Sequence, residues 1–357
     1  MLHRINKAIP AIWRDPSTLQ IGLDGNRVIL EELSLAQQQI VAALYSGVVD
    51  GQQKTLDDSV RAEQGETNSL INRLKPLLET SSKEAKHFGP WQQLVFAELA
   101  RVSLDYQVNP EMVLAERWQR VVHIDQLDRT GLIITKALLA SGVGTVVTHD
   151  TDVVISSDLG ELGFANEALG KSRFQQLKLE LEKLGLIQTE KHRLLDLSNR
   201  PSKALKISFA VISSQLAIRP KTYSRWLNRD VNHLAITYEL NELSISPVII
   251  PGQTPCLNCM QESKVDSDDA WPVIASQLLE LPQIRDDASS LLTATGLSLR
   301  VILRQLDLSA GFKVSDDVEN NFRAGYRVQY STGNVQRITY DFHKLCNCIE
   351  PLELNEI

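Results

Sequence analysis

The four cysteines of this chain constrain its fold more than any other feature. They form two close pairs, Cys256-Leu-Asn-Cys259 and Cys346-Asn-Cys348. Four thiolates at about 2.3 Å from a Zn²⁺ ion complete its tetrahedral coordination and leave no position open for catalysis. The pairs therefore predict a structural zinc site that fastens the loop after residue 250 to the C-terminal segment.

Two other interpretations of the cysteines stay open at this point. They could be four unrelated buried thiols. Cys256 and Cys259 could also form a redox dithiol, which would require the motif to open a helix directly after a strand. His343, three residues before Cys346, could replace one metal ligand, although a histidine at such a place is more often a neighbour of the site.

Composition and charge narrow the classes of function. Lys and Arg number 37 against 44 Asp and Glu, so the formal charge is -7 and there is no basic stripe for nucleic acid. No apolar run reaches the ~18 residues of a membrane-spanning helix. Pro10 and Arg14 interrupt the stretch where a signal peptide has its apolar core. We therefore expect a cytoplasmic protein with neither nucleic acid nor membrane as a partner.

The length of 357 residues predicts two or three domains. The polar stretch 80–90 ends in Gly-Pro and is typical of a linker. We expect a first domain over 1–85, a linker and helix over 86–107, and a larger domain over 108–357.

The first domain is expected to begin with strands and continue with three helices. Asp24-Gly25-Asn26 lies between two apolar runs and predicts a hairpin turn. Ser34 and Gln37 have the spacing of a capping box, so a helix should follow. Two further helices are expected over 54–62 and 67–79, with Pro76 kinking the second or ending it early. This order is typical of a small winged-helix unit.

In the larger domain, short apolar strands alternate with helices. This alternation predicts a doubly wound, mostly parallel α/β sheet with helices on both faces. The expected strands are 120–125, 145–150, 204–214, 233–240 and 244–250, with helices over 130–141, 171–185, 220–229, 269–281 and 286–306 and an antiparallel hairpin over 322–342.

The first strand-helix-strand unit of this domain has the pattern of a nucleotide site. Its second strand ends in Asp150, where nucleotide-binding sheets place an acid on the ribose hydroxyls. The turn before the helix should be rich in glycine so that backbone amides reach the phosphates. Here only Gly131 is present, and Asp125 and Asp128 bring negative charge that repels a triphosphate. We therefore do not expect ATP and Mg²⁺ to bind in the usual way.

These motifs resemble the ThiF-like branch of ubiquitin-activating-type proteins. That branch adenylates the C-terminus of a peptide or protein on a nucleotide-binding sheet that is held by a four-cysteine zinc site. The whole chain looks like the subgroup encoded with azole-forming, ribosomally synthesised peptide pathways, whose N-terminal winged helix recognises the precursor's leader peptide. The resembling segments are 12–23, 137–154, 156–173, 247–259, 269–278 and 343–348.

The chain departs from the active members of this family at the nucleotide site. They have a glycine-rich turn at 125–131, and Asn and Arg where this chain has Asp158 and Glu161. A family lysine falls at or near Arg173, and the expected catalytic aspartate is not evident in 209–215. The resemblance thus implies that the scaffold and the zinc ligands are retained while most of the ATP chemistry is lost.

We therefore predict a non-catalytic adaptor that binds a leader peptide and presents it to a YcaO-type cyclodehydratase, the partner that the resemblance implies. The peptide would add a strand beside the run 27–33 and pack against the helix at 67–79. Family members are commonly homodimers, so a homodimer is expected. The expected peptide-binding residues are Val28, Ile29, Leu30, Leu70, Ile71 and Leu74.

Two functions from other classes are kept as alternatives. One is an ATP-dependent adenylyltransferase that activates a peptide carboxylate, with Gly131, Asp150 and Arg173 at the nucleotide. The other is a winged helix that binds DNA, which the mixed charges of 54–79 disfavour.

Overall fold

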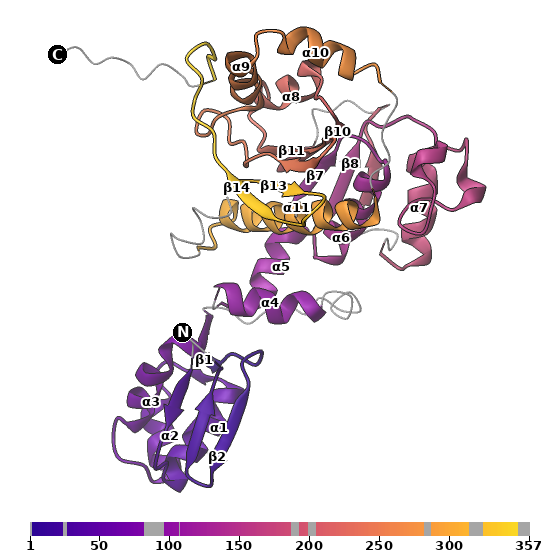
Figure 1. Cartoon of the computed structure of the whole chain (residues 1–357). Helices are drawn as coiled ribbons and strands as arrows, with labels where there is room; N and C mark the ends of the chain where they lie inside the picture. Colours follow the sequence, from indigo (N-terminus) through magenta and orange to yellow (C-terminus); the bar gives the residue numbers. More distant parts are fainter. Residues whose placement is uncertain are drawn as a thin grey trace, which may run out of the picture. The chain divides into compact units, whose positions relative to one another are not determined.

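A computed structural model describes residues 2–23, 27–81, 96–106, 108–186, 193–198, 205–281, 287–313 and 324–348. These residues divide into two compact units (Figure 1). The first unit comprises the described residues up to Glu116, together with Phe312 and Lys313, and the second comprises the others. None of the helices within the described ranges is long and apolar enough to cross a bilayer.

The first unit contains two antiparallel three-stranded sheets, with strand orders β2-β3-β4 and β5-β1-β6. Its elements are β1 (Leu2–Ile5), β2 (Ala11–Asp15), β3 (Thr18–Ile21), β4 (Val28–Leu30), α1 (Leu35–Ser46), β5 (Val48–Val49), α2 (Gln53–Val60), α3 (Glu66–Leu74), β6 (Leu78–Ser81) and α4 (Phe96–Tyr106), and α5 (Pro110–Trp118) follows at its boundary.

Local signals set the helix ends in this unit as expected. Ser34 accepts from the backbone N–H of Gln37 at 3.2 Å, and the Gln37 side chain accepts from the Ser34 N–H at 2.8 Å, which confirms the capping box. α3 ends at Leu74, and a 3₁₀ turn that contains Pro76 follows, so this helix is shorter than predicted. The Asp24-Gly25-Asn26 turn and most of the linker lie outside the described residues. The winged-helix assignment stays a prediction.

The second unit is built on one eight-stranded sheet of order β14-β13-β12-β11-β10-β7-β8-β9. The five strands from β11 to β9 are parallel, whereas β12, β13 and β14 are added antiparallel. Its elements are β7 (Val121–Ile124), α6 (Arg129–Ala140), β8 (Thr145–Thr148), α7 (Arg173–Lys183), β9 (Arg193–Asp196), β10 (Phe209–Gln215), α8 (Pro220–Leu227), β11 (His233–Tyr238), β12 (Glu242–Ile245), α9 (Leu257–Ser267), α10 (Trp271–Leu278), α11 (Ala288–Ser309), β13 (Gly325–Gln329) and β14 (Val335–Ile338).

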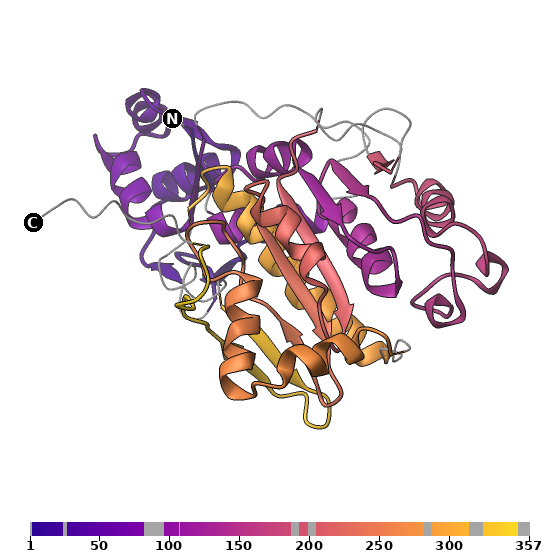
Figure 2. The same ribbon diagram turned by 90° about the horizontal axis from the view of Figure 1, so that it is seen from above.

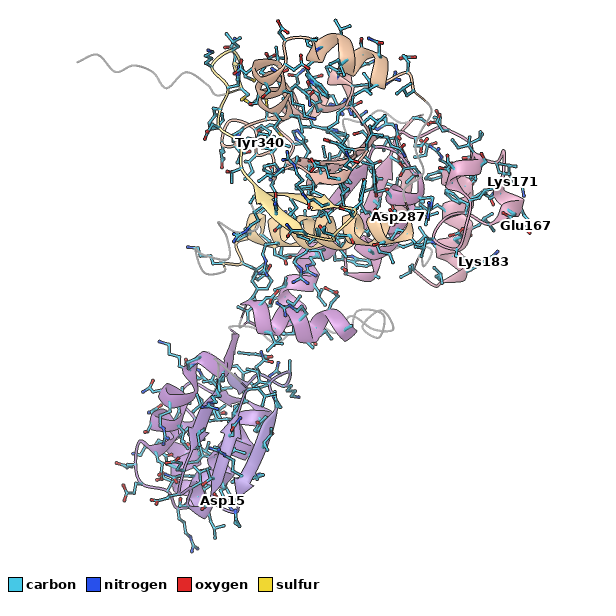
Figure 3. All side chains as sticks on the ribbon, in the orientation of Figure 1. Asp15, Glu167, Lys171, Lys183, Asp287 and Tyr340 are labelled. Carbon is cyan, nitrogen blue, oxygen red and sulfur yellow. The ribbon has the colours of Figure 1, made fainter. Side chains whose placement is uncertain are left out.

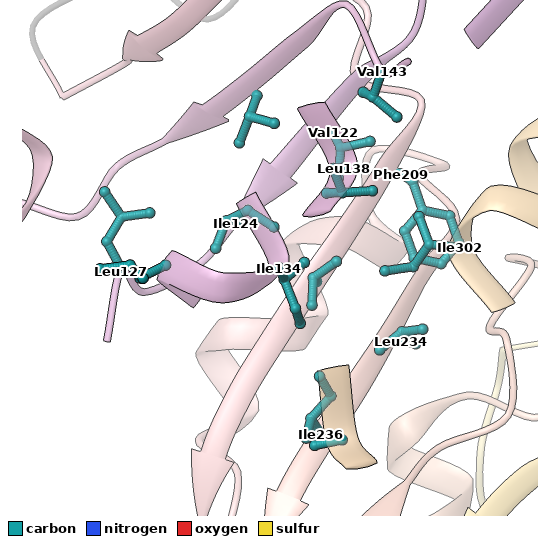
Figure 4. Close-up of a cluster of buried hydrophobic side chains, with 14 of the residues drawn as sticks. Val122, Ile124, Leu127, Ile134, Leu138, Val143, Phe209, Leu234, Ile236 and Ile302 are labelled. Atoms are coloured by element: carbon teal, nitrogen blue, oxygen red, sulfur yellow. The ribbon is translucent and has the colours of Figure 1, made fainter. Parts of the chain in front are cut away.

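Helices cover both faces of this sheet, as the strand-helix alternation predicts. α6 and α11 pack on one face, and Figure 2 shows α11 running along the strands. Their core includes Val122, Leu138, Phe209 and Ile302 (Figure 4). α8 and α9 pack on the other face around the fully buried Trp226. Because both faces are covered, the parallel strands are apolar along most of their length.

Caps define the ends of several of these elements. Asp287, labelled in Figure 3, accepts from the backbone N–H groups of Ser289 and Ser290 and begins α11. Gly142 has a φ of 97° after α6, where the sequence predicted that the helix stops. Gly333, with a φ of 68°, lies in the turn of the predicted β13–β14 hairpin, which is confirmed.

Two elements of the second unit were not predicted from the sequence. β9 adds a fifth parallel strand beside β8, with Thr145 opposite Arg193. α9 begins directly after Cys256, in a segment that we expected to be a loop.

Candidate functional site: a four-cysteine cluster and a nucleotide-type crevice

The four cysteines come together in the second unit. Sγ of Cys256 lies 3.9 Å from Sγ of Cys259 and 3.5 Å from Sγ of Cys346, and the Sγ atoms of Cys259 and Cys348 are 3.4 Å apart. All four ligand atoms lie within 4.8 Å of one another. A tetrahedron with 2.3 Å metal–sulfur bonds has edges of about 3.8 Å. The cluster therefore has the size of a four-thiolate metal site.

Local structure brings these thiols together. Cys256 is the N-cap of α9 and Cys259 lies in its first turn, while the second pair follows β14. The Nδ2 group of Asn258 donates to Sγ of Cys346 at 3.5 Å. Although the first pair does open a helix, as a redox dithiol would, its sulfurs face the other pair. Clustering of all four also rules out unrelated thiols.

His343 lies beside this cluster and is not one of its four ligands. Its Nε2 lies 3.0 Å from Oδ2 of Asp266 on α9, and its carbonyl accepts from the Cys346 N–H at 2.9 Å. The histidine therefore connects the second cysteine pair to α9, which is the role of a neighbour of the site.

The nucleotide-type crevice, as we call the place where the sequence predicts a nucleotide, is the region beyond the carboxyl ends of β7, β8 and β10. Gly131, in the first turn of α6, packs against the carbonyl of Gln126 so closely that a Cβ atom would clash with it. The glycine thus allows the turn to fold back on the helix. This is a packing reason for the glycine that needs no bound phosphate.

The amides that would receive an anion are occupied by the chain's own carboxylates. Asp128 is the N-cap of α6 and accepts from the Gly131 N–H at 2.9 Å. Asp150 accepts from the Leu127 N–H at 2.6 Å and from the Asp152 N–H at 2.7 Å. A helix N-terminus attracts anions, and here two aspartates satisfy that attraction within the fold.

Arg173 is buried among carboxylates near the same crevice. Its Nε donates to Asp158 at 2.8 Å, and its Nη1 lies 3.5 Å from Asp150. Burial by itself lowers the pKa of Arg173, but the hydrogen bond and charge of Asp158, with the charges of Asp150 and Asp128, raise it overall. The guanidinium that we expected at a nucleotide is therefore engaged by protein groups.

Asp125, the third acid of the turn, forms an ion pair with Arg225 of α8. Burial raises the pKa of Asp125, Arg225 lowers it, and Asp150 raises it further. Sequence reasoning missed Arg225 because it lies 100 residues away, and only the strand order shows that α8 packs beside β7.

The expected peptide-binding residues divide into two groups in the first unit. Val28 and Ile29 are half-buried on β4, which is an edge strand of its sheet. The side chains of the others lie in the core of the unit, so they support β4 and α3 from inside and are not open to a ligand. These buried residues are Leu30, Leu70, Ile71 and Leu74.

No model of a known protein family matches the chain, and no curated protein matches it. Several solved structures do match the chain. E. coli MccB with ATP is 14% identical, with a TM-score of 0.66, over 98% of this chain and 100% of that chain. The microcin C7 biosynthetic enzyme MccB in complex with N-formylated MccA is 15% identical, with a TM-score of 0.64, over 98% and 99%.

The chain has the fold of MccB. PaaA matches it as well, with 15% identity and a TM-score of 0.64 over 94% of this chain and 99% of that chain. At identities this low the matches establish the fold alone. That fold agrees with the doubly wound sheet that the sequence predicted.

Proposed function

We propose that this protein is an adaptor that binds the leader of a ribosomal precursor peptide and presents the peptide to a YcaO-type cyclodehydratase. The observation that carries the proposal is the crevice of the second unit, where Asp128, Asp150 and Arg173 are engaged by the chain's own groups. MccB, which shares the fold, has been crystallised with the peptide MccA and with ATP. We propose that the peptide function is kept here and the ATP function is lost.

The edge of β4 is the proposed docking place for the leader peptide. Among the described residues β4 pairs only with β3, through Leu19–Leu30, Gln20–Ile29 and Ile21–Val28. Its other edge can pair with an added strand through backbone hydrogen bonds, while side-chain pockets set the register. Val28 and Ile29 are the half-buried side chains at this strand.

The second unit would provide docking surface for the cyclodehydratase or for a second copy of the chain. α10 has no buried residue, and its Val273 is 63% exposed. Leu240, on the turn between β11 and β12, is 71% exposed. Bringing peptide and enzyme together raises the effective concentration of the peptide to roughly the millimolar range. Zinc at the four cysteines would stabilise this unit and take no part in chemistry.

Fluorescence anisotropy with a labelled leader peptide tests the proposal. The probe is the leader of a precursor encoded beside this gene, and the protein is the full chain. We expect Ile29→Asp to weaken binding at least about tenfold, because it places a charge beside the added strand. Ile12→Asp on β2, the opposite edge of the same sheet, is the matched control, since Ile12 is already 46% exposed. Failure of every such leader to bind would overturn the proposal.

Pyrophosphate exchange separates the adaptor from the adenylyltransferase alternative. Exchange that depends on added peptide would show that the crevice still activates a carboxylate with ATP, and the enzyme would then replace the adaptor. DNA binding is not proposed, because the exposed residues at the two ends of α3 include both an acid, Glu63, and a base, Lys75.

A further inference from the structure

A cavity of about 180 Å³ lies within the first unit. It is lined by the loop between β1 and β2, by Gly22 and Leu23 after β3, by the turn from Pro76 to Leu78 and by Leu104 of α4. None of the described residues in this lining carries a charge. The cavity therefore favours an uncharged ligand, because a charge that moves into apolar surroundings loses its hydration.

Asn6, which follows β1, has the polar side chain of this lining. The residue is only 2% exposed, and its Oδ1 accepts from the Ala8 N–H at 2.9 Å. Its backbone is bonded on both sides, since its N–H donates to the Leu77 carbonyl and its carbonyl accepts from the Ile9 N–H, each at 3.0 Å. These bonds hold the asparagine in one place at the wall of the cavity.

The Nδ2 group of Asn6 is available to a ligand. Because the Ala8 N–H requires an acceptor, Oδ1 is the amide atom beside it and Nδ2 is the other. Among the described residues, Nδ2 donates to no other group. Unlike the unpartnered atoms that are sealed in the core, such as Nε1 of Trp226, it keeps accessible surface. A ligand that brings an acceptor recovers the free energy of this missing bond.

The size of the cavity and its walls favour a single ring. Leu77 and Leu78 are buried, whereas Leu23 and Leu104 are 55% and 44% exposed, so the cavity has an apolar interior and apolar side chains that reach solvent. A cavity of about 150 Å³ with aliphatic walls is large enough to bind benzene. The cavity of the first unit therefore has room for one ring with a small substituent.

We propose that this cavity binds an uncharged, ring-sized apolar molecule with one acceptor oxygen, such as a small aromatic ketone, and that the oxygen accepts from Nδ2 of Asn6. A ketone brings an acceptor and no donor, so it leaves no donor of its own unpaired. The N–H groups of Ala8, Ile9 and Gly22 are already bonded within the chain, so Asn6 sets the orientation of the ligand. The proposal does not depend on capture of a leader peptide.

Three probes of similar shape test the class of ligand: acetophenone, α-methylstyrene and benzoate. The first is a neutral ketone, the second has a CH₂ group in place of the ketone oxygen, and the third is an anion. Their dissociation constants are measured by ligand-observed NMR with the full chain at pH 8. We expect acetophenone to bind, and benzoate to bind at least about tenfold more weakly, because its charge would be buried among uncharged walls.

The decisive variant is Asn6→Asp, which keeps an acceptor for the Ala8 N–H and replaces Nδ2 by an oxygen. At pH 8, well above the ordinary aspartate pKa of about 3.9, the new group has no proton to donate. Only the ketone then loses a bond, so its dissociation constant relative to that of α-methylstyrene should rise at least about fivefold. Asn72→Asp, on the exposed side of α3, is the matched control and should leave this ratio unchanged.

A second variant tests whether the probes occupy this cavity. Ala8→Leu adds a larger side chain to the lining and should weaken the binding of acetophenone at least about tenfold, because it fills the space for the ring. Ala36→Leu, at a half-buried alanine of α1 outside the lining, is the control and should leave binding unchanged. Thermal unfolding confirms that each variant folds.

Four results would each overturn the proposal: no binding of acetophenone, tighter binding of benzoate than of acetophenone, an unchanged probe ratio in Asn6→Asp, or full binding by Ala8→Leu. None of them bears on leader-peptide binding at β4, which is measured with a different probe, so the two proposals fail separately.

Discussion

Nε of Arg173 lies 2.8 Å from Oδ2 of Asp158, and the two side chains are only 4% and 2% exposed. In active members of the family that the chain resembles, a lysine and an asparagine are expected at these two places. In this chain the positive charge of Arg173 and the negative charge of Asp158 neutralise each other inside the fold. The crevice is therefore stabilised by internal charge pairing. Effects on stability or metal binding can be measured at this pair, at Gly131, at the four cysteines and at His233.

Asp158→Ala should destabilise the second unit by about 3–5 kcal/mol, because it leaves a buried guanidinium without its nearest partner. The measurement is the urea concentration at the midpoint of unfolding. Lys178→Ala is the control, since Lys178 and Glu182 form an ion pair that is 46% exposed on both sides. That change should cost less than about 1 kcal/mol. Equal effects of the two variants would contradict a structural role for Arg173 and Asp158.

Gly131→Ala should prevent correct packing of the turn before α6, because the added Cβ meets the Gln126 carbonyl. We expect a loss of several kcal/mol or insoluble protein. Gly296→Ala in α11 is the matched control. Outside its own helical turn, no atom of the described residues lies within 4 Å of the Cβ it would add, so it should stabilise the helix by about 0.5–1 kcal/mol. Circular dichroism melts distinguish the two, and a soluble, unchanged Gly131→Ala protein would contradict the packing argument.

The cysteine cluster should bind one metal ion per chain. Elemental analysis is expected to find zinc, and replacement by cobalt should give the visible absorption of tetrahedral thiolate coordination. Cys348→Ser should lose the metal and lower the melting temperature of the second unit, and a strong chelator should have the same effect. His343→Ala should keep the metal. Full zinc content in the Cys348→Ser protein, or its loss in His343→Ala, would show that the ligand set is wrong.

Stability should fall below pH 6.5, and His233 is one of the groups that cause the fall. Its ring is buried at the start of β11, and burial lowers its pKa to about 4 against a partly opposing hydrogen bond from Nδ1 to the Val231 carbonyl. A histidine that is neutral when folded protonates more readily when unfolded. Its contribution is therefore fully present above about pH 6.5 and is lost towards pH 4, by up to about 3 kcal/mol.

Urea unfolding measured from pH 8 to pH 4.5 checks this dependence. His233→Asn should make the curve shallower below pH 6.5 without removing the slope, because burial also lowers the pKa of His123. The change in stability caused by the substitution should be constant above pH 7. An unchanged slope in the variant would assign the acid sensitivity to other groups.

The strands and the clustering of the four cysteines could be predicted because their signals are local. β7, β8, β10 and β11 are short apolar runs, and the cysteine spacing is typical of zinc ligands. α9 was missed because its buried residues lie only near its start, so no helical periodicity is visible. β9 is four residues long and is a strand only because β8 offers an edge. The partners of Asp125 and Arg173 depend on contacts that only the folded sheet creates.

The peptide-binding residues show a different limit of sequence reasoning. Leu70 and Leu74 recur at helical spacing, and this pattern correctly indicates one side of α3. It cannot tell whether that side faces the interior or a ligand, because both require apolar side chains. Burial in the structure decides the question in favour of the core.

The span between the cysteine pairs has a consequence for how the protein is made. Sγ of Cys256 meets Sγ of Cys346, 90 positions later in the chain. A ribosome must release the whole stretch between them before the second pair can meet the first. During that interval the first cysteine pair, at the start of α9, lacks the second pair that would complete the cluster. Nascent chains halted at this point would therefore be exposed to cellular proteases.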